Sequence, residues 1–293
     1  MKKILITGAN SYIGTSFEKY IYGNYPDEYQ IDTLDMMDPN WKEYDFSGYD
    51  SIFHVAGIAH ADVGKVSKET EKLYYRVNCD LAYETALKAK KSKVKQFIYM
   101  SSIIVYGESA PYGKTKIITK DTMPEPANFY GDSKLQAEIK LLPLQDDSFN
   151  LVIIRPPMIY GKGSKGNYPM LSKLAKKLPV FPKINNQRSM LYVENLCEFV
   201  RLMISNNAQG IYYPQNSEYT STTTIVKTIN PGIRISGILN IGVFIGSKVP
   251  GKISVLCNKA FGNLVYEKSM SQYSENYCRY NLRESIEKTE VSS

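Results

Sequence analysis

The chain has 293 residues, of which 43% are hydrophobic and 22% are charged, which is the composition of an ordinary folded soluble protein. Its net charge of +7 comes with no recognised nucleic-acid-binding motif, so we expect solvated basic helix faces and no nucleic-acid partner. A positive field that attracts a doubly charged nucleotide is the functional alternative.

The apolar segments and the cysteines limit the cellular setting. The longest apolar stretch, Ile235 to Ile245, contains two glycines and an asparagine and is too short to span a bilayer. The four cysteines lie far apart and match neither a disulfide framework nor a metal site, and the only histidines are His54 and His60. We therefore expect a cytoplasmic protein with free thiols, no metal and no membrane partner.

The chain opens with a strand, a turn and a helix. Residues 3–7 form an apolar strand, residues 11–20 have helical spacing, and Gly8 and Gly14 lie in and just after the turn between them. In such a unit a pyrophosphate binds at the helix N-terminus, where glycines allow the backbone to approach. Ser11 replaces the middle glycine of the pattern Thr-Gly-x-x-Gly-x-x-Gly, and an ordinary strand-to-helix turn is the alternative.

The second predicted strand covers residues 29–35. It ends in Asp35, which lies 21 residues after Gly14. A carboxylate there can hold the adenosine ribose hydroxyls and repels a 2′-phosphate, so it favours NAD over NADP. Asp32 and Asp38 are nearby competitors, and capping of a turn is the alternative role of Asp35.

Strands and helices continue to alternate along the chain. We predict strands at 50–57, 96–102 and 150–155, with helices at 73–90 and 129–142 between them. This order predicts an α/β fold of the Rossmann type, with a doubly wound parallel sheet whose ligand lies at the carboxyl ends of the strands.

Several side chains lie at these predicted strand ends. Val55, Ala56 and Gly57 are small enough for a cofactor to pass close by, and Ser102 ends the next strand. We interpret His54 as a packed strand residue and not as a catalyst.

Tyr130 and Lys134 are four positions apart in the predicted 129–142 helix, so the phenol and the ammonium share one face. A phenol needs its pKa lowered by roughly 3 units to act as a base near neutrality, and an adjacent cation is the simplest cause. The spacing alone is weak evidence among 24 tyrosines and 36 basic residues. The glycine turn near the N-terminus and Ser101-Ser102 at the end of a predicted strand strengthen the interpretation of Tyr130 and Lys134 as catalytic residues.

The second half of the chain is less regular. We predict an NAD-binding Rossmann domain over residues 1–162 and a smaller mixed α/β substrate-binding lobe over 163–293, with a helix near 192–206 that packs back on the sheet. Residues 107–128 are rich in glycine, proline and lysine and predict a loop over the site. A short strand is expected within 255–265.

Together these motifs resemble the extended short-chain dehydrogenase/reductase family. The motifs are, in chain order, the turn Thr7 to Gly14, His54-Val55-Ala56-Gly57, Asn78, Ser101 to Gly107, Tyr130-Gly131-Asp132-Ser133-Lys134 and Arg155 to Gly161. Within the family the chain is most similar to NAD-dependent nucleotide-sugar epimerases and dehydratases of the UDP-glucose 4-epimerase kind. The resemblance covers about the first 200 residues.

The resemblance implies a role for individual residues. Tyr130 is the base, Lys134 lowers its pKa and holds the nicotinamide ribose, and Ser102 hydrogen-bonds the reacting sugar oxygen. Arg188 grips the nucleotide diphosphate, a task that suits a bidentate guanidinium. Substrate contacts are Ser102, Tyr130 and Arg188. The implied NAD contacts are Gly8, Ser11, Tyr12, Ile13, Gly14, Asp35, Asp45, Phe46, Val55, Ala56, Gly57, Asn78, Ser101, Tyr130, Lys134 and Pro157.

The resemblance further implies epimerisation at C4 of a UDP-hexose or UDP-N-acetylhexosamine through a 4-keto intermediate. It also implies a homodimer joined through the helices at 73–90 and 129–142. Dehydration is not expected, because Ile103 and Ile104 stand where 4,6-dehydratases carry an acidic pair. An NAD(P)H-dependent 4-ketoreductase and a non-catalytic dinucleotide sensor are the alternatives.

Overall fold

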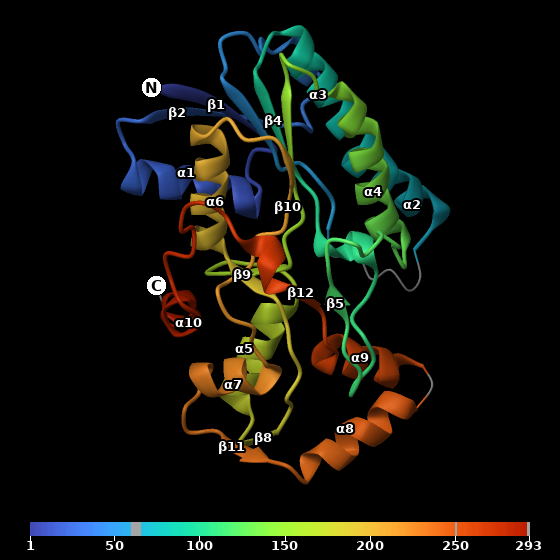
Figure 1. The fold of residues 1–293 in the computed structure, drawn as a ribbon. Coiled ribbons are helices and arrows are strands. Elements are labelled where there is room, and N and C mark those ends of the chain that lie inside the picture. Colours follow the sequence, from blue (N-terminus) through green and yellow to red (C-terminus); the bar gives the residue numbers. More distant parts are fainter. Residues whose placement is uncertain (60–65, 250, 292–293) are drawn as a thin grey trace.

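The computed structural model describes residues 1–59, 66–249 and 251–291, and a parallel sheet of six strands lies at its centre (Figure 1). The strands are β1 Lys2–Thr7, β2 Tyr29–Leu34, β3 Ser51–His54, β4 Gln96–Met100, β6 Asn150–Ile154 and β10 Gly210–Tyr212. Their order is β10-β6-β4-β3-β1-β2. Because β2 and β3 flank β1 on opposite sides, the winding reverses there, and the predicted doubly wound sheet is confirmed.

Helices cover both faces of this sheet. They are α1 Tyr12–Asn24, α2 Lys68–Tyr75, α3 Leu81–Lys91, α4 Phe129–Leu141 and α6 Val193–Ser205. The first and last of these cover one face, and α2, α3 and α4 lie on the other side (Figure 1). In β1, Ile4 and Ile6 belong to one core and Leu5 to the other, as the alternation of side chains along a strand requires.

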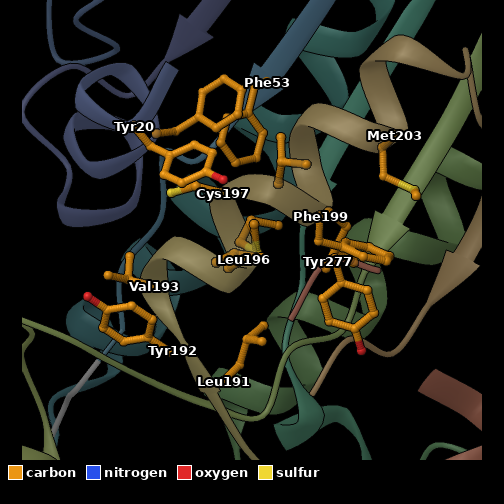
Figure 2. Packing of buried hydrophobic residues seen from close by; sticks show 14 of the residues in the cluster. Tyr20, Phe53, Leu191, Tyr192, Val193, Leu196, Cys197, Phe199, Met203 and Tyr277 are labelled. Atoms are coloured by element: carbon orange, nitrogen blue, oxygen red, sulfur yellow. The ribbon is translucent and has the colours of Figure 1, made fainter. Parts of the chain in front are cut away.

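The α6 helix is a central part of the first core. Ten of its 13 residues are buried, so little of it can face solvent. Figure 2 shows its side chains among residues from distant parts of the chain, including Tyr20 and Phe53. Phe199 meets Tyr277 edge to face, with 4.8 Å between ring centroids. The helix therefore fastens later parts of the chain to the sheet.

The remaining elements form a smaller mixed α/β region around three two-stranded parallel sheets. The strand pairs are β7 Met158–Tyr160 with β9 Met190–Tyr192, β8 Val180–Pro182 with β11 Arg234–Ser236, and β5 Ile117–Ile118 with β12 Val265–Tyr266. The helices are α5 Asn167–Lys177, α7 Thr222–Ile229, α8 Leu239–Lys248, α9 Lys252–Phe261 and α10 Leu282–Glu290. Pairing of β5 with β12 ties the 107–128 segment to this region.

The expected strand within 255–265 is wrong, because α9 occupies most of these residues and only β12 begins at Val265. A short apolar run does not distinguish a strand from a helix. Here Ile253, Cys257 and Phe261 recur at the four-residue spacing of one helix face, and Gly262 follows the last helical residue.

Candidate active site

The N-terminus of α4 is held close to the turn that follows β4. Asn128 caps the helix, since its side chain accepts the Gly131 N–H at 3.0 Å. A Cβ atom at Gly131 would lie 2.8 Å from the Ile104 carbonyl oxygen, so glycine permits this approach. As a result the Tyr130 hydroxyl is hydrogen-bonded to the Ser102 side chain.

Burial dominates the titration of Tyr130. It raises the pKa of the phenol to about 12, which the hydrogen bond from Ser102 partly offsets and the neighbouring Tyr74 increases. In the chain's own groups burial outweighs any lowering, and the expectation that Lys134 lowers this pKa stays a prediction. The physical reason is that a phenolate loses hydration in the interior. At neutral pH the phenol is protonated.

Lys134 lies at the carboxyl ends of β3 and β4. Its Nζ donates to the Met100 carbonyl at 2.9 Å and lies 4.9 Å from the ring centroid of Tyr99. Burial lowers the pKa of Lys134 to about 8, while Glu138 acts in the opposite direction. A Cβ atom at Gly57 would lie 3.1 Å from this Nζ, so the ammonium faces the small residues after β3.

Asn78 joins that segment to α4. The predicted single helix over 73–90 contains a π-helical turn, Arg76–Asp80, between α2 and α3, and such turns are frequent at functional sites. The fully buried Asn78 accepts the Ile58 N–H at 2.8 Å and donates to Ile58 O and to Ser133 Oγ, at 3.1 and 3.0 Å. Its amide thus fixes the backbone after Gly57.

The glycine turn after β1 is tightly packed. Gly8 has φ +121°, and a Cβ atom on it would lie 2.6 Å from the Ala56 nitrogen, so only glycine fits. Ser11, in place of the middle glycine, is the N-cap of α1, because its Oγ accepts the Gly14 N–H at 3.1 Å. The N–H groups of Tyr12 and Ile13 in the first turn then remain outside the intrahelical ladder.

Two of the implied cofactor carboxylates are exposed at turns. Asp35 directly follows β2, and its Oδ1 accepts the Met37 N–H at 2.9 Å. Asp32 instead accepts a hydrogen bond from the Tyr49 hydroxyl at 2.7 Å. Asp45 is exposed, and hydrogen bonds from Ser47 lower its pKa.

The remaining residues implied by the resemblance are more deeply placed. Phe46 is fully buried in the core beneath α3, and Pro157 is buried just after β6. The N–H groups of Val55 and Ala56 both donate to Thr7 O, at 3.0 and 2.9 Å, which joins the ends of β3 and β1.

A buried ionic network lies behind Ser101 and was not predicted from the sequence. Ser101 Oγ donates to the carboxylate of Glu138, and Arg155 Nε donates to both oxygens of that carboxylate, at 3.1 and 3.2 Å. Arg155 Nη1 donates to the Tyr106 hydroxyl at 2.6 Å. Glu138 and Arg155 are 1% and 6% exposed. One sequence feature could have pointed to Glu138, because it lies four residues after Lys134 and therefore on the same face of the helix.

Arg188 lies in the smaller region of the chain. Its Nε donates to the Gly262 carbonyl at 3.3 Å, and its backbone pairs with Thr220. Burial lowers the pKa of Arg188 to about 10, so the guanidinium is still charged at neutral pH.

His54 is a packed strand residue, as expected. It is fully buried against the rings of Phe97 and Tyr99, and its Nδ1 shares a hydrogen bond of 2.8 Å with Thr7 Oγ1. Burial, supported by the charge of Lys134, lowers the pKa of the imidazole to about 3.

The low pKa of His54 predicts acid sensitivity. Between pH 6.5 and 3 the unfolded chain binds a proton at this position that the native state excludes, so stability falls as the pH falls. From pH 6.5 to 4.5 the loss attributable to His54 is about 2–3 kcal/mol. Urea unfolding at both values should show a smaller loss in a His54→Asn variant. An equal loss in both proteins would contradict the prediction.

The residues at the strand ends fit a dinucleotide. The turn at Gly8 approaches the end of β3 without a side chain, α1 begins there, Asp35 ends β2 and Lys134 stands beside Gly57. These groups suit a pyrophosphate, a ribose diol and a second ribose in that order. Within residues 1–59, 66–249 and 251–291, no group of three or more His, Cys, Asp or Glu side chains is arranged to hold a metal ion.

Comparisons with known proteins agree with this geometry. The family model described as NAD dependent epimerase/dehydratase family matches residues 4–213. A UDP-glucose 4-epimerase from Vibrio cholerae is 31% identical over an alignment of 248 positions, which covers 78% of this chain and 75% of that protein. An N-acetyl-α-D-glucosaminyl-diphospho-ditrans,octacis-undecaprenol 4-epimerase from Escherichia coli O157:H7 is 30% identical over 226 residues, covering 71% of this chain and 64% of the relative.

Solved structures share the fold. A dTDP-4-dehydrorhamnose reductase ortholog from Clostridium acetobutylicum has a TM-score of 0.71 at 18% identity, with 98% of each chain covered. The Bordetella bronchiseptica enzyme WbmG in complex with NAD and UDP has a TM-score of 0.70 at 16% identity, covering 98% of this chain and 92% of the other. With the sequence match over 4–213, the chain belongs to the NAD dependent epimerase/dehydratase family.

Proposed function

We propose that the protein is an NAD-dependent epimerase that acts at C4 of a nucleotide sugar, a UDP-hexose or UDP-N-acetylhexosamine. The observation that carries this proposal is the hydrogen bond between Ser102 and Tyr130 beside the buried ammonium of Lys134, at the carboxyl ends of the central strands. The names of two relatives that are 30% or more identical, both 4-epimerases, support it.

The chain's own residues would handle the proton and the orientation of the sugar. NAD, when bound, would supply the hydride acceptor and donor and a positive charge. With Lys134 and the positive charge of bound NAD beside it, Tyr130 would be held as the phenolate, would take the proton of the C4 hydroxyl, and would return it after the 4-keto sugar has turned over. Ser102 donates a hydrogen bond to the same sugar oxygen and so fixes its approach, a positional effect worth several kcal/mol. Lys134 stabilises the phenolate while it exists.

The cofactor and the substrate would bind to different regions of the chain. Residues 1–162 together with α6 would hold NAD, through Gly8, Tyr12, Ile13 and the other strand-end residues described above. Residues 163–293 would mainly bind the substrate. There Arg188 would pair the diphosphate oxygens, since a guanidinium fork matches phosphate geometry.

We expect Arg188→Lys to raise KM for the nucleotide sugar by about 10- to 100-fold with a smaller change in kcat, because a point charge replaces a bidentate donor. Steady-state kinetics would measure this split, and the NAD content of the purified protein should not change. The control is Arg234→Lys, an exposed arginine in the same region. An unchanged KM would remove Arg188 from the substrate site.

A panel of UDP-sugars tests the reaction directly. Separation of the products should give a pair of C4 epimers without added cofactor, because the hydride returns to the sugar. The 4-ketoreductase alternative uses the same three side chains but consumes NADH or NADPH stoichiometrically, which the loss of near-ultraviolet absorbance would reveal. A 4,6-dehydratase is disfavoured because Ile103 and Ile104 offer no carboxyl groups. Absence of conversion together with absence of bound dinucleotide would favour neither enzyme.

We infer a cytoplasmic homodimer. Ile139 and Leu142, in and just after α4, are 52% and 44% exposed, which supports an interface formed by this helix and its neighbour α3. The four cysteines are free, which suits a reducing compartment. Light scattering of the purified protein tests the dimer.

A further inference from the structure

The helical hairpin formed by α8 and α9 exposes large apolar side chains. Gly246 lets the two helices approach, since a Cβ atom there would lie 3.2 Å from Cys257 Sγ. α8 has no buried residue, and Phe244 is 55% exposed. We call the following side chains the apolar hairpin surface: Ile238, Leu239, Ile241, Phe244, Ile245, Val249, Ile253 and Val255. So many large apolar side chains exposed on one helical hairpin indicate a contact site.

The chain segment that contains this surface carries charges of one sign. From Tyr219 to Tyr266 the sequence has no Asp or Glu but five basic residues, namely Lys227, Arg234, Lys248, Lys252 and Lys259. The chain average of 29 acidic residues in 293 would place about five in these 48 positions, so the absence is marked. Two copies joined through this surface would bring like charges together, whereas an anionic surface complements them.

Contact with a bilayer does not require a spanning helix. In the described parts of the chain, no helix has the length and apolar character needed to cross a membrane. A helix that lies in the plane of the interface needs only an apolar side and nearby lysines or arginines. The expectation of no membrane partner rested on the shortness of the 235–245 stretch and on the lack of a recognised motif for binding a membrane surface, and the exposed hairpin is visible only in the structure.

The hairpin is also tied to the rest of the smaller region. Asn258 Oδ1 in α9 accepts the Tyr112 N–H at 2.9 Å, and the Gly262 carbonyl just after α9 accepts from Arg188 Nε. In Figure 1 the hairpin lies at the end of the molecule away from β2, next to β5. It is thus part of the folded chain and not a detached tail.

We propose that the apolar hairpin surface docks the protein on an anionic phospholipid bilayer, with the apolar side chains in the interface and Lys248, which lies over the Phe244 ring, at the headgroups. This inference does not rest on the proposed reaction, since it concerns a surface outside the strand-end site. A bilayer-docked orientation would place the Arg188 side of the molecule near the lipid.

Vesicle sedimentation with the full chain tests the docking. Phosphatidylcholine vesicles with 40% phosphatidylglycerol should bind at least about tenfold more protein than pure phosphatidylcholine vesicles, and 0.5 M NaCl should remove most of that difference. Phe244→Ser with Ile245→Ser should abolish binding, and Lys248→Glu should weaken it about tenfold or more. Val291→Ser, which changes an apolar residue 63% exposed elsewhere, should bind as wild type. Unchanged melting temperatures confirm that the variants fold.

A fluorescence signal gives an independent readout. Phe244→Trp should shift its emission to the blue and be quenched by brominated lipids, while Trp41, 7% exposed in the sheet core, contributes a constant background. Three outcomes would overturn the proposal: no binding to anionic vesicles, equal binding of the Phe244→Ser with Ile245→Ser variant, or a stable dimer in lipid-free buffer that this variant alone converts to monomer.

Discussion

Replacing Tyr130 with phenylalanine is expected to reduce turnover by about a thousandfold or more while the dinucleotide stays bound. The change deletes the one hydroxyl that exchanges a proton with the sugar, and a positioned acid–base group contributes about 10²–10⁴-fold. Folding should be preserved, because the ring keeps its edge-to-face contact with Tyr74, at 6.0 Å between centroids. The measurements are kcat for epimerisation and the NAD released on denaturation.

Tyr75→Phe is the matched control for this experiment. It also removes a phenolic hydroxyl that reaches α4, since the Tyr75 hydroxyl donates to Asp132 at 2.6 Å. That bond lies away from Ser102, so this variant should retain most of its turnover. If Tyr130→Phe kept more than about a tenth of wild-type turnover, general acid–base catalysis by Tyr130 would be ruled out.

Glu138→Ala is expected to lower the free energy of unfolding by about 3–5 kcal/mol, because it leaves the Arg155 guanidinium buried without its carboxylate. Ser101 Oγ loses its acceptor at the same time. Urea unfolding at pH 7 measures the loss. The exposed pair of Arg283 and Glu287 provides the control, and Glu287→Ala should cost less than about 1 kcal/mol.

A double replacement tests whether stability requires the charged pair or only that neither charge is left alone. Glu138→Leu with Arg155→Met replaces both charges by apolar groups, which often restores much of the stability lost by breaking a buried pair. We therefore expect the double variant to be more stable than Glu138→Ala. A loss of under 1 kcal/mol in Glu138→Ala would show that water reaches Arg155 and that the pair is not a buried one.

Features encoded within one short segment could be predicted from the sequence. The strand, turn and helix around Gly8 follow from adjacent residues, and the shared face of Tyr130 and Lys134 follows from helical periodicity. The alternation of such units predicted the sheet. The strand expected near Val255 failed because a short apolar run fits either structure, and tertiary packing decides between them.

Features that depend on distant partners could not be predicted. Glu138 and Arg155 meet only because α4 packs on the strand that Arg155 follows, 17 residues later. The raised pKa of Tyr130 likewise depends on how deeply the folded chain buries the phenol, which spacing along the helix does not report. In the sequence, Ser11 is a departure from the glycine motif, and only the structure identifies it as the N-cap of α1.

Two elements that complete the central sheet, α6 and β10, come late in the chain, and this order matters while the protein is being translated. β10 pairs with β6, and α6 covers the face formed by Ile4, Ile6 and Phe53, yet both elements are translated after residue 192. A nascent chain that has left the ribosome only as far as Tyr160 therefore presents to water the part of this apolar face that α1 does not cover. Chaperone binding should be strongest over that interval and should decline once residue 212 has emerged.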